Sequence, residues 1–326
     1  MADFPRSLSI QLARFFSADS LFKSKTPIFL PFYHTVSNKN LNYIKNYPYR
    51  NEKEFERELD YILKYFTPVS LDDLRTDPNP GKKVFHLSFD DGLRECAEVI
   101  APILVRKGIP ATFFVNTGFV DNKNLFHRYK ASLILTQLQH SPDSQAELFL
   151  SKKGLNRENI LKANFHQSDI LDEAAEMMEL DFADFLENEK PYLSTKEIKK
   201  LHKNGFSIGG HGHDHAEFRI LKPKEQRRQV EKSMEWLDKH IQPKIKAFSF
   251  PFTDDAVSEK LLKKLKKDEV CDITFGTAGL KNDTVSSHFQ RVPMEQNRDV
   301  GSFLKGEFLY FKLRKIVGKA TVKHPY

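Results

Sequence analysis

The strongest constraint on the fold is a repeated alternation of short apolar runs with amphipathic segments. Strand-like runs occupy residues 28–36, 84–89, 112–116, 206–209, 246–250 and 272–276. Segments with apolar side chains at helical spacing lie between several of these runs. Strands that alternate with helices predict a parallel sheet with helical crossovers. Because the units are numerous, we expect a closed or partly closed α/β barrel rather than an open sheet.

Local signals mark where several of the helices begin and end. Asn51 with Glu54, and Ser194 with Glu197, each have the spacing of a capping box. Gly108 is expected to end the helix that follows the second strand-like run.

One stretch interrupts the alternation. Residues 121–191 are rich in Leu, Glu, Asp and Lys and look mostly helical, so we interpret them as an insertion into a single domain that spans residues 1–326. Such an insertion could shape a substrate cleft, but a purely structural cap is an equally good interpretation. Residues 299–326 are expected to form a C-terminal helical extension.

Composition bounds the class of protein. The chain has 326 residues and a formal charge of +7, which a solvated Lys-rich surface explains best. A nucleic-acid site would be indicated by a basic run with interleaved aromatics, and the sequence shows no such run. The two cysteines, Cys96 and Cys271, exclude a disulfide framework. Residues 1–25 do not read as a secretory signal, and no apolar stretch is long enough to span a bilayer. These observations predict a cytoplasmic protein.

The C-terminal segment allows two interpretations. Apolar residues alternate there with basic ones; the apolar set is Phe303, Leu304, Phe308, Leu309, Phe311, Ile316 and Val317. Packing of a helix against the barrel is the preferred interpretation. The alternative is a basic amphipathic helix that makes peripheral membrane contact.

The first chemical motif is the run Ser88-Phe89-Asp90-Asp91-Gly92 at the end of a predicted strand. Successive side chains at a strand end point in different directions, so one carboxylate could bind a metal while the other activates water. Taken alone, Asp-Asp-Gly fits an ordinary turn better.

The second motif is Gly209-Gly210-His211-Gly212-His213-Asp214-His215. Histidines this close together, flanked by glycines, indicate a metal site, and imidazole suits zinc, cobalt or nickel. His213 is the member most easily explained as a solvent-facing side chain. Two histidines and one carboxylate would leave open positions for water and substrate, as catalytic metal sites require.

These motifs resemble those of the polysaccharide deacetylase family, the NodB-homology domain of carbohydrate esterase family 4. Residues 89–92 resemble its first motif, residues 205–211 with His215 its second, and Ser249-Phe250-Pro251-Phe252 its third. The similarity is greatest to the circularly rearranged branch that includes poly-N-acetylglucosamine deacetylases. It implies a distorted, TIM-like barrel of seven or eight strands, a carbohydrate substrate, and metal-dependent removal of N-acetyl groups with release of acetate.

The resemblance also implies roles for individual residues. Asp90 matches the catalytic base, and the metal ligands match Asp91, His211 and His215, with zinc the expected metal and cobalt or nickel as alternatives. The backbone N–H of Phe252 matches an oxyanion donor. His34, in a Tyr-His context, matches the acid of the rearranged branch, and His288 is the alternative acid.

Three features depart from the family pattern. No Leu-x-His near the C-terminus offers the usual acid, which is why His34 is the candidate. Gly212 stands where Ser or Thr is usual, which could loosen the loop. Ser249 occupies a motif that often carries an Arg near the base, and Arg291 is a candidate to supply that charge from elsewhere. Two other functions therefore stay open: hydrolysis of another carbon–nitrogen amide bond, and an inactive glycan-binding or assembly protein.

Overall fold

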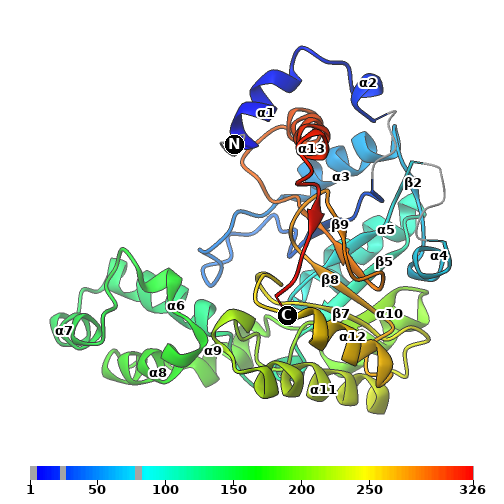
Figure 1. Ribbon diagram of the computed structural model, residues 1–326. Helices are drawn as coiled ribbons and strands as arrows, with labels where there is room; N and C mark the ends of the chain where they lie inside the picture. The colour runs from blue at the N-terminus through cyan, green and yellow to red at the C-terminus, as the bar shows by residue number, and fades with distance from the viewer. Residues whose placement is uncertain (1–5, 23–26, 78–82, 326) are drawn as a thin grey trace.

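The main sheet is parallel and nearly closed into a barrel, which confirms the predicted fold class. The computed structural model describes residues 6–22, 27–77 and 83–325 (Figure 1). The strands of the sheet lie in the order β10-β8-β7-β6-β5-β4-β1-β11. Their bounds are β1 (Pro31–Tyr33), β4 (Leu87–Phe89), β5 (Ala111–Val115), β6 (Ser207–Gly210), β7 (Ala247–Ser249), β8 (Ile273–Gly276), β10 (His288–Gln290) and β11 (Val292–Pro293).

One short segment brings the two edges of this sheet together. β10 pairs with β8 at one edge and β11 pairs with β1 at the other, and only Arg291 separates β10 from β11 in the sequence. The Arg291 N–H donates to the Gly276 carbonyl at 3.1 Å, and the Val292 N–H donates to the Leu30 carbonyl at 2.8 Å. The chain therefore crosses from one edge to the other at Arg291, whose side chain is fully buried.

Helices cover the outside of the barrel. They are α3 (Glu52–Leu63), α4 (Leu71–Thr76), α5 (Ala101–Lys107), α10 (Thr195–Lys203), α11 (Pro223–His240) and α12 (Glu259–Lys267), with a π-helical turn at Cys96–Ile100 before α5. Both predicted capping boxes are present, at Asn51 with Glu54 and at Ser194 with Glu197. Gly108 ends α5 with φ 66°, as predicted.

A lobe of helices lies beside the barrel, between β5 and α10 (Figure 1). It contains α6 (His127–His140), α7 (Ser144–Lys152), α8 (Ser168–Met177) and α9 (Phe182–Glu189). Short 3-10 turns accompany these helices at Val120–Asn122, Ile160–Lys162 and Phe165–Gln167, and another lies beyond the lobe at Phe218–Ile220. The first three helices share an apolar core of their own, which includes Ile134, Leu150 and Leu171. The interpretation of residues 121–191 as an insertion within a single domain stays a prediction.

The N-terminal helices pack against the last helix at the top of the molecule in Figure 1, whereas the C-terminus lies lower, near α12. α1 (Arg6–Ala13) and α2 (Ala18–Phe22) lie against α13 (Val300–Ile316). Two small parallel sheets complete the fold: β12 (Thr321–Val322) pairs with β9 (Asn282–Asp283), and β2 (Thr67–Pro68) pairs with β3 (Val84–Phe85).

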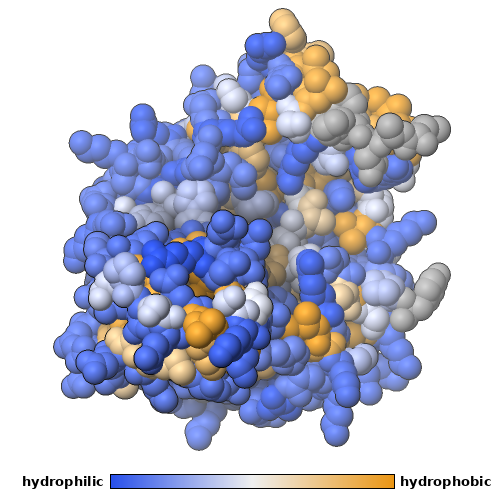
Figure 2. All heavy atoms as spheres, turned by 90° about the vertical axis from the view of Figure 1, so that its left-hand side faces the viewer, coloured by the Kyte–Doolittle hydropathy of each residue, from blue (hydrophilic) through white to orange (hydrophobic). Residues whose placement is uncertain are grey.

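The apolar side chains of α13 mostly face inward. Phe303, Leu304, Phe308, Leu309 and Phe311 are all buried, which favours the packing interpretation of this segment over membrane contact. Ile316 and Val317 at its end are exposed. Figure 2 shows a mostly polar surface with apolar side chains gathered at the top, where α1 and the turn after it expose Phe15 and Phe16. In the described part of the chain, no helix is both long and apolar enough to cross a membrane.

Candidate metal centre and active site

The candidate site lies at the carboxyl ends of neighbouring barrel strands. Asp90 and Asp91 directly follow β4, His211 follows β6, and His34 follows β1. In barrels of this kind, the loops at this end of the strands carry the chemistry. Parallel pairing of β1 with β4, and of β4 with β6 through β5, brings these side chains to one edge.

Asp91, His211 and His215 converge in the manner of a metal site. The Asp91 Oδ1 lies 2.9 Å from the His215 Nε2 and 3.6 Å from the His211 Nε2, and one ligand atom of each residue lies within 4.8 Å of the others. All three residues are buried. Among the described residues Asp91 Oδ1 has no hydrogen-bond donor, which is costly for a buried carboxylate oxygen without a cation. The donor set of two imidazoles and one carboxylate therefore fits a divalent metal.

Outer contacts orient these three ligands. His211 Nδ1 donates to the Ser249 carbonyl at 2.9 Å, which fixes the tautomer and leaves the lone pair of Nε2 facing the site. The Tyr129 hydroxyl donates to Asp91 Oδ2 at 3.2 Å, and the hydroxyls of Tyr129 and Tyr47 lie 2.8 Å apart. The second carboxylate oxygen is thus satisfied by protein, and the first is left for a cation.

The protonation states suit metal binding. Burial lowers the pKa of His211 to about 4, so the ring is neutral at pH 7. Burial alone would raise the pKa of Asp91, but His215 and other nearby imidazoles hold it well below its usual range. A neutral imidazole and an ionised carboxylate are the forms that bind metal.

Arg291 lies directly on Asp90, as the sequence suggested. Its Nη1 donates to Asp90 Oδ1 at 2.8 Å and its Nη2 donates to Asp90 Oδ2 at 2.7 Å. The guanidinium also bonds to Ser88 Oγ at 2.9 Å and to Ser249 Oγ. Burial would raise the pKa of Asp90, but this bidentate pair holds it below its ordinary value. The segment that closes the barrel therefore compensates the charge of the carboxylate.

His34 lies near enough to both carboxylates for their charges to affect its pKa. Its Nδ1 is paired with a Glu295 carboxylate oxygen, and the other oxygen of Glu295 accepts from the His34 backbone N–H at 2.8 Å. The Tyr47 ring stacks on the imidazole with centroids 4.4 Å apart. Burial by itself lowers the pKa of His34, but Glu295, with smaller contributions from Asp91 and Asp90, raises it to about 9. His34 is therefore protonated at neutral pH.

Three residues of the site have a left-handed backbone. Asp91, His215 and Phe252 have φ of 71°, 50° and 60°. This conformation is uncommon for residues other than glycine, and such strain is concentrated at functional sites. The Phe252 ring packs on His215 with centroids 4.8 Å apart, and within the described residues its backbone N–H donates no hydrogen bond.

Two of the predicted residues lie outside this cluster. His213 Nδ1 bonds to Thr117 Oγ1 at 3.0 Å, and the ring is 30 % exposed. His288 pairs with Asp254 at 2.9 Å in a separate cluster. The structure therefore does not favour His288 as the acid.

The departure at Gly212 has a structural explanation. Gly212 has φ 81°, where Ser or Thr would be strained. The loop is held instead by Gln229, whose Oε1 accepts the N–H groups of His213 and Asp214 at 3.0 Å each. The expected loosening is thus offset by a side chain from α11.

Sequence reasoning missed the residues that support the site. Tyr47 comes from the loop before α3, Tyr129 from α6, and Glu295 from the segment after β11. Glu295 had no signal in the sequence, because the short strand that precedes it, β11, was not predicted. Tyr47 and Tyr129 had none, since aromatic residues are common in this chain.

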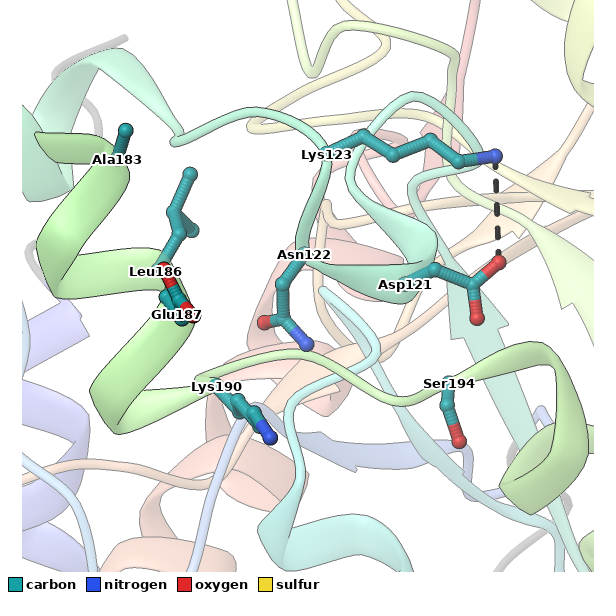
Figure 3. A pocket seen from close by; sticks show the side chains of 8 residues that line it. All are labelled: Asp121, Asn122, Lys123, Ala183, Leu186, Glu187, Lys190 and Ser194. Carbon is teal, nitrogen blue, oxygen red and sulfur yellow. Dashed lines mark ion pairs between the residues drawn. The ribbon is translucent and has the colours of Figure 1, made fainter.

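A hollow on the lobe is distinct from this cluster. It has a volume of about 420 Å³ and lies between α9 and the turn at 120–122; Figure 3 labels its lining as Asp121, Asn122, Lys123, Ala183, Leu186, Glu187, Lys190 and Ser194. Asp121 faces Lys123 at 3.9 Å and also accepts from Thr195. None of the candidate catalytic residues lines this hollow.

Comparison with known structures identifies the fold. A deacetylase from Streptococcus pyogenes, PplD, aligns over 87 % of this chain and 99 % of its own with a TM-score of 0.55 at 16 % identity. IcaB from Ammonifex degensii aligns over 87 % and 97 % with a TM-score of 0.56 at 15 % identity. BC0361, a polysaccharide deacetylase from Bacillus cereus, aligns over 86 % and 68 % with a TM-score of 0.54 at 16 % identity. At such low identity these likenesses show a shared fold.

Comparison by sequence identifies the family. No curated protein matches the chain. The family profile of polysaccharide deacetylases matches residues 77–270, which is more than half of the sequence and includes both the Asp-Asp and the histidine motifs. The chain therefore belongs to the polysaccharide deacetylase family and is a hydrolase of the deacetylase class.

Proposed function

We propose that this protein is a metal-dependent hydrolase that removes N-acetyl groups from an amino-sugar-containing glycan or glycan precursor and releases acetate. One observation carries the proposal: the buried convergence of Asp91, His211 and His215 beside an ionised Asp90 and a protonated His34. A base, an acid and a set of atoms able to bind a metal are what hydrolysis of an unactivated amide requires.

Asp91, His211 and His215 would hold the divalent metal. Zinc suits two imidazoles and one carboxylate best, and cobalt or nickel are the alternatives. When bound there, such a metal would polarise the acetamide carbonyl and lower the pKa of water toward about 7.

Asp90 is the proposed base. Its Oδ2 lies 3.7 Å from His211 Nε2, so the carboxylate borders the metal-binding atoms and can accept a proton from the attacking water. Arg291 keeps Asp90 ionised and fixes the plane of the carboxylate through two hydrogen bonds. The hydroxide so formed adds to the acyl carbon.

Phe252 and His34 are proposed to act on the two sides of the acyl group. The Phe252 N–H would stabilise the negative charge that develops on the carbonyl oxygen. His34 would donate its Nε2 proton to the departing nitrogen, because Nδ1 is held by Glu295. The carbon–nitrogen bond then breaks, leaving acetate and a free amine.

The substrate separates this proposal from its nearest alternative. The family is mainly directed at carbohydrate, so we place N-acetylated amino sugars ahead of cyclic ureides and other amides. Acetate release from chitin oligosaccharides, measured beside ring opening of cyclic ureides to the open-chain ureido acid, distinguishes the two. Hydrolysis of the ureide alone would overturn the carbohydrate assignment, and glycan binding without any hydrolysis would favour an inactive binding protein.

The base is tested by Asp90→Asn. We expect turnover to fall by at least about 100-fold, in line with loss of general base catalysis, while bound metal stays at the wild-type amount. His213→Gln is the matched control, since it changes a histidine of the same loop that lies outside the cluster, and it should keep both activity and metal. An active Asp90→Asn variant would show that the base is assigned wrongly.

A further inference from the structure

A second group of metal-binding side chains lies apart from the candidate active site. Asp254 follows β7, Asp283 belongs to β9, His288 begins β10, and His324 follows β12. One ligand atom from each lies within 4.8 Å of the others. The side chains of all four are at most 4 % exposed. Residues far apart in the sequence therefore bring two imidazoles and two carboxylates to one buried point.

One contact within the group, between His324 and Asp283, needs a positive charge. His288 needs none, because its Nδ1 lies 2.8 Å from the Thr274 hydroxyl, which can donate to it and leave the proton on Nε2. His288 Nε2 lies 2.9 Å from Asp254 Oδ2, and His324 Nε2 lies 3.0 Å from Asp283 Oδ2. His324 Nδ1 lies 3.0 Å from the Val257 carbonyl, which can only accept, so Nδ1 carries the proton of the neutral ring. The Nε2 lone pair then faces a carboxylate oxygen. Either a second proton or a cation must lie between them.

The outer contacts resemble those that hold metal ligands in place. Asp254 Oδ1 accepts from the Thr277 N–H at 3.3 Å, and Asp283 Oδ1 accepts from the Val285 N–H at 2.9 Å. Gln290 Nε2 donates to Oδ2 of both aspartates, at 2.7 and 2.9 Å. Each carboxylate is thus oriented by hydrogen bonds that still leave a lone pair of Oδ2 toward the centre.

The geometry points to a second, structural metal site formed by Asp254, Asp283, His288 and His324, with zinc as the cation. Four protein ligands without an open position are typical of structural zinc. A divalent cation would neutralise both carboxylates while both imidazoles stay neutral, as ligands must be. The inference does not depend on the proposed function, because none of these residues belongs to the candidate active site.

The site would fasten the C-terminal segment to the loop after β7. In Figure 1 the chain runs from α13 through β12, beside β9, and ends near α12. The Glu259 N–H donates to the Pro325 carbonyl at 2.9 Å, which places this segment against the start of α12. Thr277, whose N–H bonds to Asp254, also donates its hydroxyl to the Phe252 carbonyl at 3.0 Å. The metal would therefore also steady the loop that carries Phe252.

Metal content tests the inference directly. Purified protein is loaded with zinc, freed of loosely bound metal by gel filtration, and analysed by elemental mass spectrometry. We expect two zinc ions in the wild type, one in His211→Ala and one in His324→Gln. His202→Gln, a histidine of α10 outside both clusters, should keep two. One zinc in the wild type, unchanged in His324→Gln and lost in His211→Ala, would overturn the second site.

A second measurement covers the case in which His324→Gln fails to fold. In the His211→Ala background only the proposed structural site is left, so a chelator should lower its melting temperature by roughly 5 °C, and added zinc should restore it. Asp283→Asn in the same background should abolish this response. A melting temperature of His211→Ala that is indifferent to chelator and zinc would show that protons rather than a metal compensate the carboxylates.

Discussion

At the scale of single residues, the site depends on buried charges that compensate one another. Asp90 and Arg291 are each almost fully buried and are joined by two hydrogen bonds. Breaking a buried pair by removing one partner leaves an uncompensated charge, whose cost exceeds the value of the bond itself. The pair is therefore as important for stability as for holding the base.

We expect Arg291→Met to lower the free energy of unfolding by about 3–5 kcal/mol, since Asp90 would be left buried without its partner. Urea titration followed by circular dichroism measures the change. Arg228→Met is the control, because Arg228 pairs with Glu225 on the surface and its loss should cost less than about 1 kcal/mol. If both variants lose the same free energy of unfolding, the buried pair matters no more for stability than the surface pair.

The pH dependence of activity follows from His34. As the proposed acid it must be protonated, and with its pKa at about 9 activity should fall as the pH rises through that value. Glu295→Gln removes the negative charge that raises the pKa, so the alkaline limb should move toward the ordinary value of about 6.5. The measurement is kcat/KM against pH for both proteins. Glu235→Gln, at an exposed position, is the control and should leave the pH profile unchanged. If the alkaline pKa of the Glu295→Gln profile equals that of the wild type, His34 is not the acid.

The residues that carry chemistry could largely be predicted from the sequence, and those that support them could not. Asp91, His211 and His215 are recognisable because a metal demands particular side chains at close spacing. Tyr47 and Tyr129 reach Asp91 from a loop and from the helical lobe, and only the folded chain shows that they meet. Arg291 was a candidate to supply a positive charge near the base. Its contact with Asp90, however, depends on how the barrel closes.

At the scale of elements, prediction succeeded where a segment has a period or a cap of its own. α3 and α10 begin at the predicted capping boxes, and the last four apolar runs became β5 to β8 with bounds shifted by at most one residue. The run at 84–89 split into β3 and β4, and the run at 28–36 yielded only the short strand β1. The closing segment 288–293 was missed. It is very short and contains His, Gln, Arg and Pro, so it has no alternation to read, and its conformation is imposed by pairing with β8 and β1.

Helix α6 links the lobe to the candidate metal site through Tyr129. Tyr129→Phe removes the hydroxyl that donates to Asp91 Oδ2, and loss of such an outer contact typically weakens metal binding about 10- to 100-fold. Competition with a chelator for zinc measures the affinity. Tyr43→Phe is the matched control, because the Tyr43 ring packs on Tyr129 but its buried hydroxyl has no partner among the described residues. Equal affinities in Tyr129→Phe and wild type would show that the lobe does not tune this site.

At the scale of the whole molecule, the N-terminal helices and α13 stabilise each other on the barrel. α1 and α2 lie along α13, and Arg6 pairs with Glu307 across the contact between α1 and α13. Gly306 permits this close approach, since a Cβ there would lie 2.8 Å from the Cα of Ile10. Leu8 and Leu12 on the rest of α1 are exposed, so the contact with α13 supplies most of the packing of this helix.

Gly306→Leu should therefore release α1 while the barrel stays folded. The larger side chain cannot fit beneath Ile10. α1 contributes Ala13 to the main apolar core, whereas α13 contributes several large side chains that do not depend on Gly306. Hydrogen exchange should show lost protection of the α1 amides, with β5 and β6 unchanged. Ser302→Leu places the same side chain on an exposed position of α13 and should leave α1 protected. Protection lost equally in α1 and in the barrel strands would instead mean that the chain ends and the barrel unfold as one cooperative unit.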